Sequence, residues 1–153
     1  MISLVLATYL ADREIKNHIN ATRKLGSKEV ILEGKATLRN VHNHVHPMER
    51  FGQTKEQKDL LVKGSILCPI LYYVYAHLKG KKGGLFRLSS SLLLGGALGN
   101  WVERLEAGYA TDYISLEVGP KKLRRYCFNL ADVAIVLGGT LGFLAILLHK
   151  DRK

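Results

Sequence analysis

Stretches without charge alternate with highly charged stretches along this chain. Residues 66–78 and 127–148 are almost free of charged side chains, whereas residues 20–59 are crowded with them. The apolar run from Cys127 to His149 is long enough to cross a bilayer core of roughly 30 Å, at about 1.5 Å per helical residue. A soluble core rarely needs so long an apolar segment. The pattern therefore predicts an integral membrane protein.

The same pattern predicts four membrane-spanning helices in a single domain that covers residues 1–153. The first helix is short, and Asp12 and Lys16 interrupt it. These two side chains lie four residues apart on one helical face, so Lys16 either pairs with Asp12 or extends outward to the membrane surface. The approximate bounds of the four spans are 1–19, 60–78, 85–103 and 127–149.

The polar segment after the first span has a different periodicity. KEVILEGKATLRNVHNH alternates loosely between apolar and polar residues, with a turn expected at Gly34. We expect a small β-cradle, at about residues 27–50, that rests on the membrane surface. The fold class is thus an all-α membrane protein with a small β subdomain. Glycines four residues apart predict close helix packing, at Gly95/Gly99 and at Gly138/Gly142.

The formal net charge of +10 does not point to nucleic acid, because the basic residues flank apolar segments. Such flanks set the topology of membrane helices and contact anionic lipid. The basic loop between the second and third spans and the basic C-terminus are expected in the cytoplasm, which puts residues 20–59 and 104–126 outside. That loop carries Lys79, Lys81, Lys82 and Arg87. The outer segments are also basic, notably at Lys121, Lys122, Arg124 and Arg125. We keep the orientation because a subdomain on the membrane surface tolerates such charge.

Two aspartates lie on the outer face in this topology. Asp112 follows the third span, and Asp132 lies about one turn into the fourth. Two neighbouring carboxylates do not both ionise easily, so one keeps a proton while the other acts as a base toward a water that attacks a peptide carbonyl. Such a pair requires no metal and no cofactor. The alternative is that Asp132 pairs with a basic residue and only holds two helices together.

The histidines offer a second candidate for chemistry. His42, His44 and His46 alternate, so on a strand they would share one face, as metal ligands do. No fourth ligand is apparent and Pro47 follows. We therefore interpret them as surface histidines and predict no metal site.

The stretches that hold the two aspartates resemble the lipoprotein signal peptidase (signal peptidase II) family. GGALGNWVERLEAGYATDYI followed by FNLADVAI is similar to its paired signature. The family's D-x-x-x-K in the first span is matched by Asp12 and Lys16, and VHN at 41–43 matches a stretch that ends in a functional asparagine, here Asn43. The signature residues present are Gly95, Gly96, Ala97, Gly99, Asn100, Arg104, Gly108, Asp112, Phe128, Asn129, Ala131 and Asp132.

The resemblance implies an aspartyl endopeptidase of the bacterial cytoplasmic membrane, with its active site on the extracytoplasmic side. Such enzymes remove the signal peptide from diacylglyceryl-modified prolipoproteins just before the lipidated cysteine. The resemblance makes Asp112 and Asp132 the catalytic dyad. The residues expected to support the site or contact substrate are Asp12, Lys16, Asn43, Asn100, Arg104 and Asn129. The expected partners are lipid-modified prolipoproteins and membrane lipid, with no nucleic acid, and the expected state is a monomer.

Three positions depart from the family pattern. Glu103 stands where the family has aspartate, Tyr113 replaces phenylalanine, and HVHPMERF follows Asn43 in place of a run of small residues. These departures leave one alternative open: a diverged member that binds lipoproteins or lipopeptides without cutting them. A second alternative is a small proton-coupled transporter that uses the aspartates as a relay. It would need a polar path through the inner halves of the spans, which are rich in Leu, Ile, Val and Gly.

Overall fold

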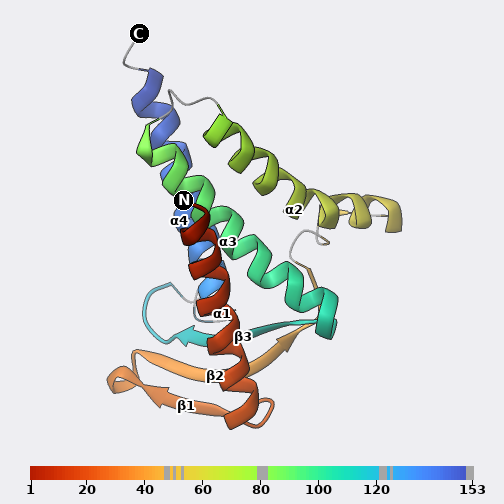
Figure 1. The fold of residues 1–153 in the computed structure, drawn as a ribbon. Coiled ribbons are helices and arrows are strands. Elements are labelled where there is room, and N and C mark those ends of the chain that lie inside the picture. The colour runs from red at the N-terminus through yellow and green to blue at the C-terminus, as the bar shows by residue number, and fades with distance from the viewer. Residues whose placement is uncertain are drawn as a thin grey trace.

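The computed structural model describes residues 1–46, 49, 51, 52, 54–78, 83–120, 124 and 126–150. Four long helices run from the end where the N-terminus lies toward a small sheet at the opposite end (Figure 1). The helices are α1 (Ile2–Thr22), α2 (Lys55–Leu78), α3 (Gly84–Ala107) and α4 (Leu130–Lys150). The strands are β1 (Lys28–Ile31), β2 (Ala36–Asn43), β3 (Ala110–Leu116) and β4 (Cys127–Phe128), with a 3-10 turn η1 (Leu32–Gly34) between β1 and β2.

The observed helices match the four predicted apolar segments, with two corrections. Asp12 and Lys16 do not interrupt α1, which is one continuous helix in which both side chains are buried. Cys127 does not begin the last helix, because Cys127 and Phe128 form β4 and the helix begins at Leu130. Lys79, Lys81, Lys82, Lys121, Lys122, Arg125 and Pro47 lie outside the described residues.

Among the described residues, two helices are long and apolar enough to cross a membrane, Lys55–Leu78 and Leu130–Leu148. In α1 the ADREIK stretch puts four charged residues in the middle of the helix, and the middle of α3 is rich in serine and glycine. A charged side chain in a helix facing lipid is costly unless it points into the protein and finds a partner. That all four helices cross the membrane stays a prediction.

The sheet is antiparallel, with the strand order β1-β2-β3-β4. The hairpin expected around Gly34 is present: Ile31 pairs with Ala36, and the chain reverses through residues with positive φ, including Gly34 at 85°. The pairing of β2 with β3 brings Asn43 opposite Ala110 and Val41 opposite Asp112. The sheet therefore places the end of the hairpin beside Asp112.

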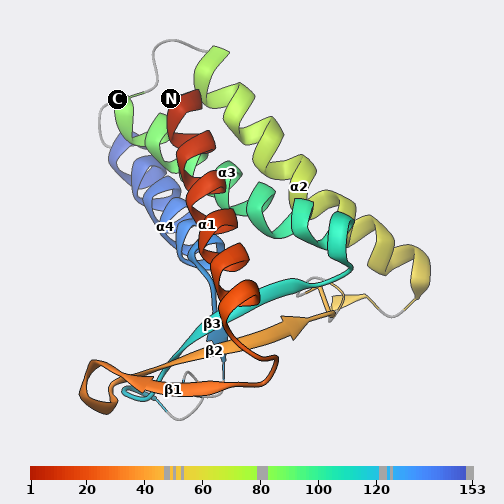
Figure 2. The same cartoon turned by 60° about the horizontal axis from the view of Figure 1, so that its bottom comes forward.

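Helix α3 lies between the others and packs against all three (Figure 2). Glycines permit this packing, as the sequence predicted. A Cβ atom at Gly95 would lie 2.8 Å from the Thr8 Cβ atom of α1, and one at Gly138 of α4 would lie 2.7 Å from the backbone nitrogen of Leu93. A Cβ atom at Gly99 would lie 2.8 Å from the carboxylate of Asp12. The close contact at Gly99 brings Asp12 to the region where α3 meets the start of α4.

Candidate active site

The start of α4 is buried, and side chains satisfy its backbone. Asn129 and Asp132 cap it reciprocally: the Asp132 N–H donates to Asn129 Oδ1 at 2.9 Å, and the Asn129 N–H donates to Asp132 Oδ2 at 3.2 Å. The Leu130 N–H donates to the Tyr113 hydroxyl at 2.8 Å, and the Ala131 N–H donates to Asp12 Oδ1 at 2.9 Å. The first N–H groups of a helix lack partners within the helix. These four side chains supply them and so fix the position of Asp132.

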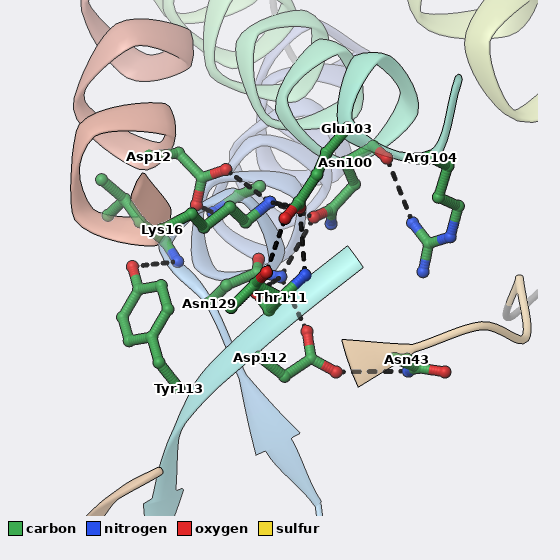
Figure 3. Close-up of polar contacts among 12 residues, drawn as sticks. Asp12, Lys16, Asn43, Asn100, Glu103, Arg104, Thr111, Asp112, Tyr113 and Asn129 are labelled. Atoms are coloured by element: carbon green, nitrogen blue, oxygen red, sulfur yellow. Dashed lines mark hydrogen bonds and ion pairs between the residues drawn. The ribbon is translucent and has the colours of Figure 1, made fainter. Parts of the chain in front are cut away.

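Uncharged amides bind the two aspartates (Figure 3). Asn129 Nδ2 donates to Asp112 Oδ1 at 2.8 Å, and Asn43 Nδ2 donates to Asp112 Oδ2 at 3.2 Å. Asn100 Nδ2 donates to Asp132 Oδ1 at 2.8 Å. Together with the Asn129 backbone, each of the four carboxylate oxygens has a neutral donor. Asn129 contacts both aspartates, so the two carboxylates lie on either side of one residue.

The environment of Asp112 favours its protonated form. Its side chain is buried at the beginning of β3, where only 6% of the residue is exposed. Burial, followed by the charge of Asp132, raises the pKa of Asp112 to about 6, against the opposing effects of the Asn43 hydrogen bond and of Arg104 and Lys16. Asp112 therefore titrates closer to neutral pH than an ordinary carboxyl group does.

A buried ammonium group lies behind the aspartates. Lys16 Nζ is 2.7 Å from Asp12 Oδ2 and 3.0 Å from Glu103 Oε2, and it donates to Asn100 Oδ1 at 2.8 Å. Of the two positions expected for Lys16, the structure has the pairing with Asp12. Two carboxylates and an amide oxygen surround the charge, as a buried lysine requires.

Two further residues, Glu103 and Arg104, come from the last turns of α3. Glu103 accepts hydrogen bonds from the Thr111 N–H at 3.0 Å and from the Thr111 hydroxyl at 2.6 Å. Arg104 Nη1 donates to the backbone oxygen of Asn100 at 3.3 Å. Its buried Nε has no hydrogen-bond partner among the described residues. Arg104 is thus held near the aspartates with donor capacity to spare.

Two cavities meet at Asp132. The larger, of about 540 Å³, lies between the sheet and α4 and reaches both Asp112 and Asp132. The smaller, of about 350 Å³, lies between α2, α3 and α4. Both are bounded by Arg104, Asp132 and Val136. The walls of the larger cavity are mostly apolar, formed by Val45, Leu116, Tyr126, Phe128, Val133, Val136 and Leu137. A mostly apolar cavity with a few convergent polar groups is typical of a ligand site.

The alternating histidines contact other side chains: His42 and His44 contact Tyr109, and His46 contacts α2. His42 stacks on Tyr109 with ring centroids 3.7 Å apart, and its Nε2 lies 3.1 Å from Asn20 Oδ1. His44 meets the same tyrosine edge-on, while His46 contacts Ser65 of α2. In the part of the chain that the structure describes, no three His, Cys, Asp or Glu side chains are grouped so as to hold a metal ion.

The structure brings all eight residues singled out in the sequence into one region: Asp12, Lys16, Asn43, Asn100, Arg104, Asp112, Asn129 and Asp132. Sequence reasoning missed the contribution of Thr111, and it noted Glu103 and Tyr113 only as departures. The one signal available for Thr111 was its place next to Asp112 in the sequence. Nothing local in the sequence links Tyr113 to the start of α4.

Comparison with known proteins decides the family. The family model described as signal peptidase (SPase) II matches residues 4–148. The chain belongs to the signal peptidase II family. Among relatives named lipoprotein signal peptidase, that of Halothermothrix orenii is 28% identical over 150 residues, covering 98% of this chain and 95% of the relative. That of Lactococcus lactis is 30% identical over 155 residues, covering 100% and 98%.

One further relative matches part of the chain, and one solved structure has a similar fold. The lipoprotein signal peptidase of Moorella thermoacetica is 38% identical over 98 residues, which is 64% of this chain and 59% of the relative. A bacterial membrane enzyme solved by the in meso method superimposes with a TM-score of 0.81 at 21% identity, covering 95% of this chain and 91% of that one. At that identity the likeness shows the fold alone.

Proposed function

We propose that this signal peptidase is an intramembrane aspartyl endopeptidase. Its substrates are diacylglyceryl-modified prolipoproteins, and it cuts just before the lipidated cysteine. The observation that carries the proposal is that two carboxylates, the buried Asp112 and the half-buried Asp132, share Asn129 as a hydrogen-bond partner and border one apolar cavity. The names of the relatives supply the substrate class.

The reaction follows from one proton shared by two carboxylates. The ionised aspartate takes a proton from a water, whose oxygen bonds to the carbonyl carbon of the scissile peptide. The protonated aspartate donates its proton to the carbonyl oxygen. When the tetrahedral intermediate collapses, one of its hydroxyl groups returns a proton to the ionised aspartate as the C=O bond re-forms. The C–N bond breaks, and the leaving nitrogen takes the proton from the other aspartate, so the dyad again holds one proton. No metal, cofactor or covalent enzyme intermediate takes part.

The surroundings of the dyad have supporting roles in this proposal. Asn43, Asn100 and Asn129 hold the carboxylates without neutralising them, because an amide donates a hydrogen bond but carries no charge. Arg104 lines both cavities beside Asp132, where its guanidinium can donate to a substrate carbonyl. The apolar walls of the larger cavity suit a signal peptide or acyl chains that arrive laterally from the bilayer. The enzyme acts as a monomer, with this site on the extracytoplasmic side of the cytoplasmic membrane.

A family member that binds lipoproteins without cutting them is the second candidate. The sequence after Asn43 favours it, since His46 and Ser65 add polar groups to the smaller cavity. Against it, burying two neighbouring carboxylates costs free energy that binding alone does not require. A proton-coupled transporter is less well supported. The buried serines of α3 use their hydroxyl protons in bonds to backbone carbonyls rather than in a proton path. Ser89 donates to Gly138 of α4, and Ser90 and Ser91 donate to Arg87 of α3.

Cleavage of a lipobox-containing prolipoprotein by the purified protein tests the proposal. Asp112→Asn and Asp132→Asn should each lower kcat by about 10²- to 10⁴-fold, the usual range for loss of a general acid or base. Asp59→Asn, at an exposed position on α2, is the matched control and should cut at the wild-type rate. Cleavage by both dyad variants at the wild-type rate would refute the assignment. Substrate binding without turnover by the wild-type protein would favour the binding protein.

A further inference from the structure

We infer that Glu103 is a positioning residue that fixes the spacing of the two aspartates. This inference rests on the proposed function. Glu103 touches neither aspartate. Its carboxylate instead contacts Thr111, the residue before Asp112, and Lys16, which leads through Asn100 to Asp132. Figure 3 shows Glu103 between Lys16 and Thr111.

The first set of contacts runs through Thr111, which immediately precedes Asp112. Glu103 accepts from both the N–H and the hydroxyl of Thr111, at 3.0 and 2.6 Å. Two bonds to one residue fix its orientation as well as its position. The Thr111 side chain is fully buried, and its hydroxyl also accepts a hydrogen bond from Asn20 of α1. Because Thr111 and Asp112 are joined by a planar peptide, holding the first restrains the second.

The second set of contacts runs through Lys16. Glu103 Oε2 lies 3.0 Å from Lys16 Nζ, which donates to Asn100 Oδ1 at 2.8 Å. The amide nitrogen of Asn100 then donates to Asp132 Oδ1 at 2.8 Å. Lys16 thereby fixes which side of the Asn100 amide faces Asp132. The ion pair between Glu103 and Lys16 joins the two sets of contacts on the side of the site away from Asn129, which joins them directly.

The length of the glutamate side chain is what allows both contacts. Glu103 projects from α3 and reaches Thr111 on β3 and Lys16 on α1, with only 16% of its side chain exposed. A glutamine at this position keeps the length but replaces one carboxylate oxygen by an NH2 group, which cannot accept the hydrogen bond or form the ion pair that the oxygen made. Displacing a catalytic group by about 1 Å can cost on the order of 10²-fold in rate.

The decisive experiment is the Glu103→Gln variant, tested on the prolipoprotein substrate in detergent. We expect kcat to fall by about 10- to 100-fold while KM stays within about twofold, because a misplaced dyad impairs chemistry rather than substrate binding. Glu106→Gln is the matched control: the same change on the same helix, at a glutamate that pairs with Arg13 on the surface. It should behave as wild type. A merely structural glutamate would lower the melting temperature and leave kcat of the folded protein unchanged.

A pair of substitutions at Thr111 keeps the inference testable if Glu103→Gln fails to fold. Thr111→Ser retains the hydroxyl, whereas Thr111→Val keeps the shape and removes the hydroxyl hydrogen bond to Glu103 but not the backbone one. A lower kcat for Thr111→Val than for Thr111→Ser supports the inference, and equal values overturn it. Wild-type kcat for Glu103→Gln, with Asp112→Asn inactive, overturns the inference and leaves the proposed function standing. Activity in Asp112→Asn would instead defeat the proposed function.

Discussion

At the scale of single residues, Asn129 combines a structural role with a place in the site. Its backbone and Oδ1 cap α4 with Asp132, while its Nδ2 faces the Asp112 carboxylate. One side chain therefore both starts the helix that carries one aspartate and holds the other. The sequence motif FNLAD is compact for this reason: Asn129 and Asp132 lie at the spacing of a capping box.

Asp112 should make the stability of the protein depend on pH. Its folded-state pKa of about 6 lies above the ordinary 3.8, so its stabilising contribution is fully present below about pH 4 and is lost as pH rises through 6. Asp112→Asn cannot ionise. Relative to wild type it should gain up to about 3 kcal/mol between about pH 4 and pH 7.5. Thermal unfolding in detergent at both pH values measures this, and a difference that stays constant with pH would contradict it.

At the scale of elements, close contact between α3 and α4 holds Asn100 against the start of α4. The contact depends on Gly138, where a Cβ atom would lie 2.7 Å from the backbone nitrogen of Leu93, an atom that cannot move without shifting α3. The next glycine, Gly139, has nothing within 4 Å of its Cβ position. The sequence shows two adjacent glycines, and only the structure distinguishes them.

Gly138→Ala should therefore destabilise the bundle by about 1–3 kcal/mol through overpacking. Gly139→Ala should be neutral or stabilising by up to about 1 kcal/mol, because alanine is the better helix former. Melting temperatures of the two variants in the same detergent give the comparison. Equal effects would mean that α3 and α4 do not pack as the structure has them.

At the scale of the whole molecule, the sheet and both aspartates lie at one end of the helices, and the start of α3 lies at the other (Figure 1). If the site is extracytoplasmic, the two ends must differ in access to a reagent that cannot cross the membrane. Val30 on β1 and Gly84 at the start of α3 are both exposed and mark the two ends.

Single-cysteine labelling in spheroplasts tests this orientation. In a background that lacks Cys68 and Cys127, Val30→Cys should react with an impermeant maleimide in intact spheroplasts. Gly84→Cys should react only after the membrane is opened, because the intact membrane keeps the maleimide out of the cytoplasm. The reverse labelling pattern would show that the active site faces the cytoplasm.

The sequence by itself determined the long helices and the hairpin around Gly34. It also determined that Asp112 follows the end of one helix and that Asp132 lies at the start of the next. Each depends on local information: uninterrupted apolar runs, alternation with a glycine turn, and motifs of a few residues. The start of the last helix was misplaced at Cys127 because apolar composition continues through β4. The Asn129–Asp132 capping pair marks the true boundary more sharply than hydrophobicity does.

Only the tertiary structure decided that β3 and β4 join the hairpin in one sheet, and that Asn129 contacts both aspartates. It also decided that Lys16 and Glu103 pair with each other and contact Asn100 and Thr111, next to the aspartates. These contacts join segments far apart in the chain, such as Ala131 with Asp12 and Thr111 with Asn20. Their partners are chosen by how helices and strands pack in three dimensions. No periodicity within a single segment encodes that choice.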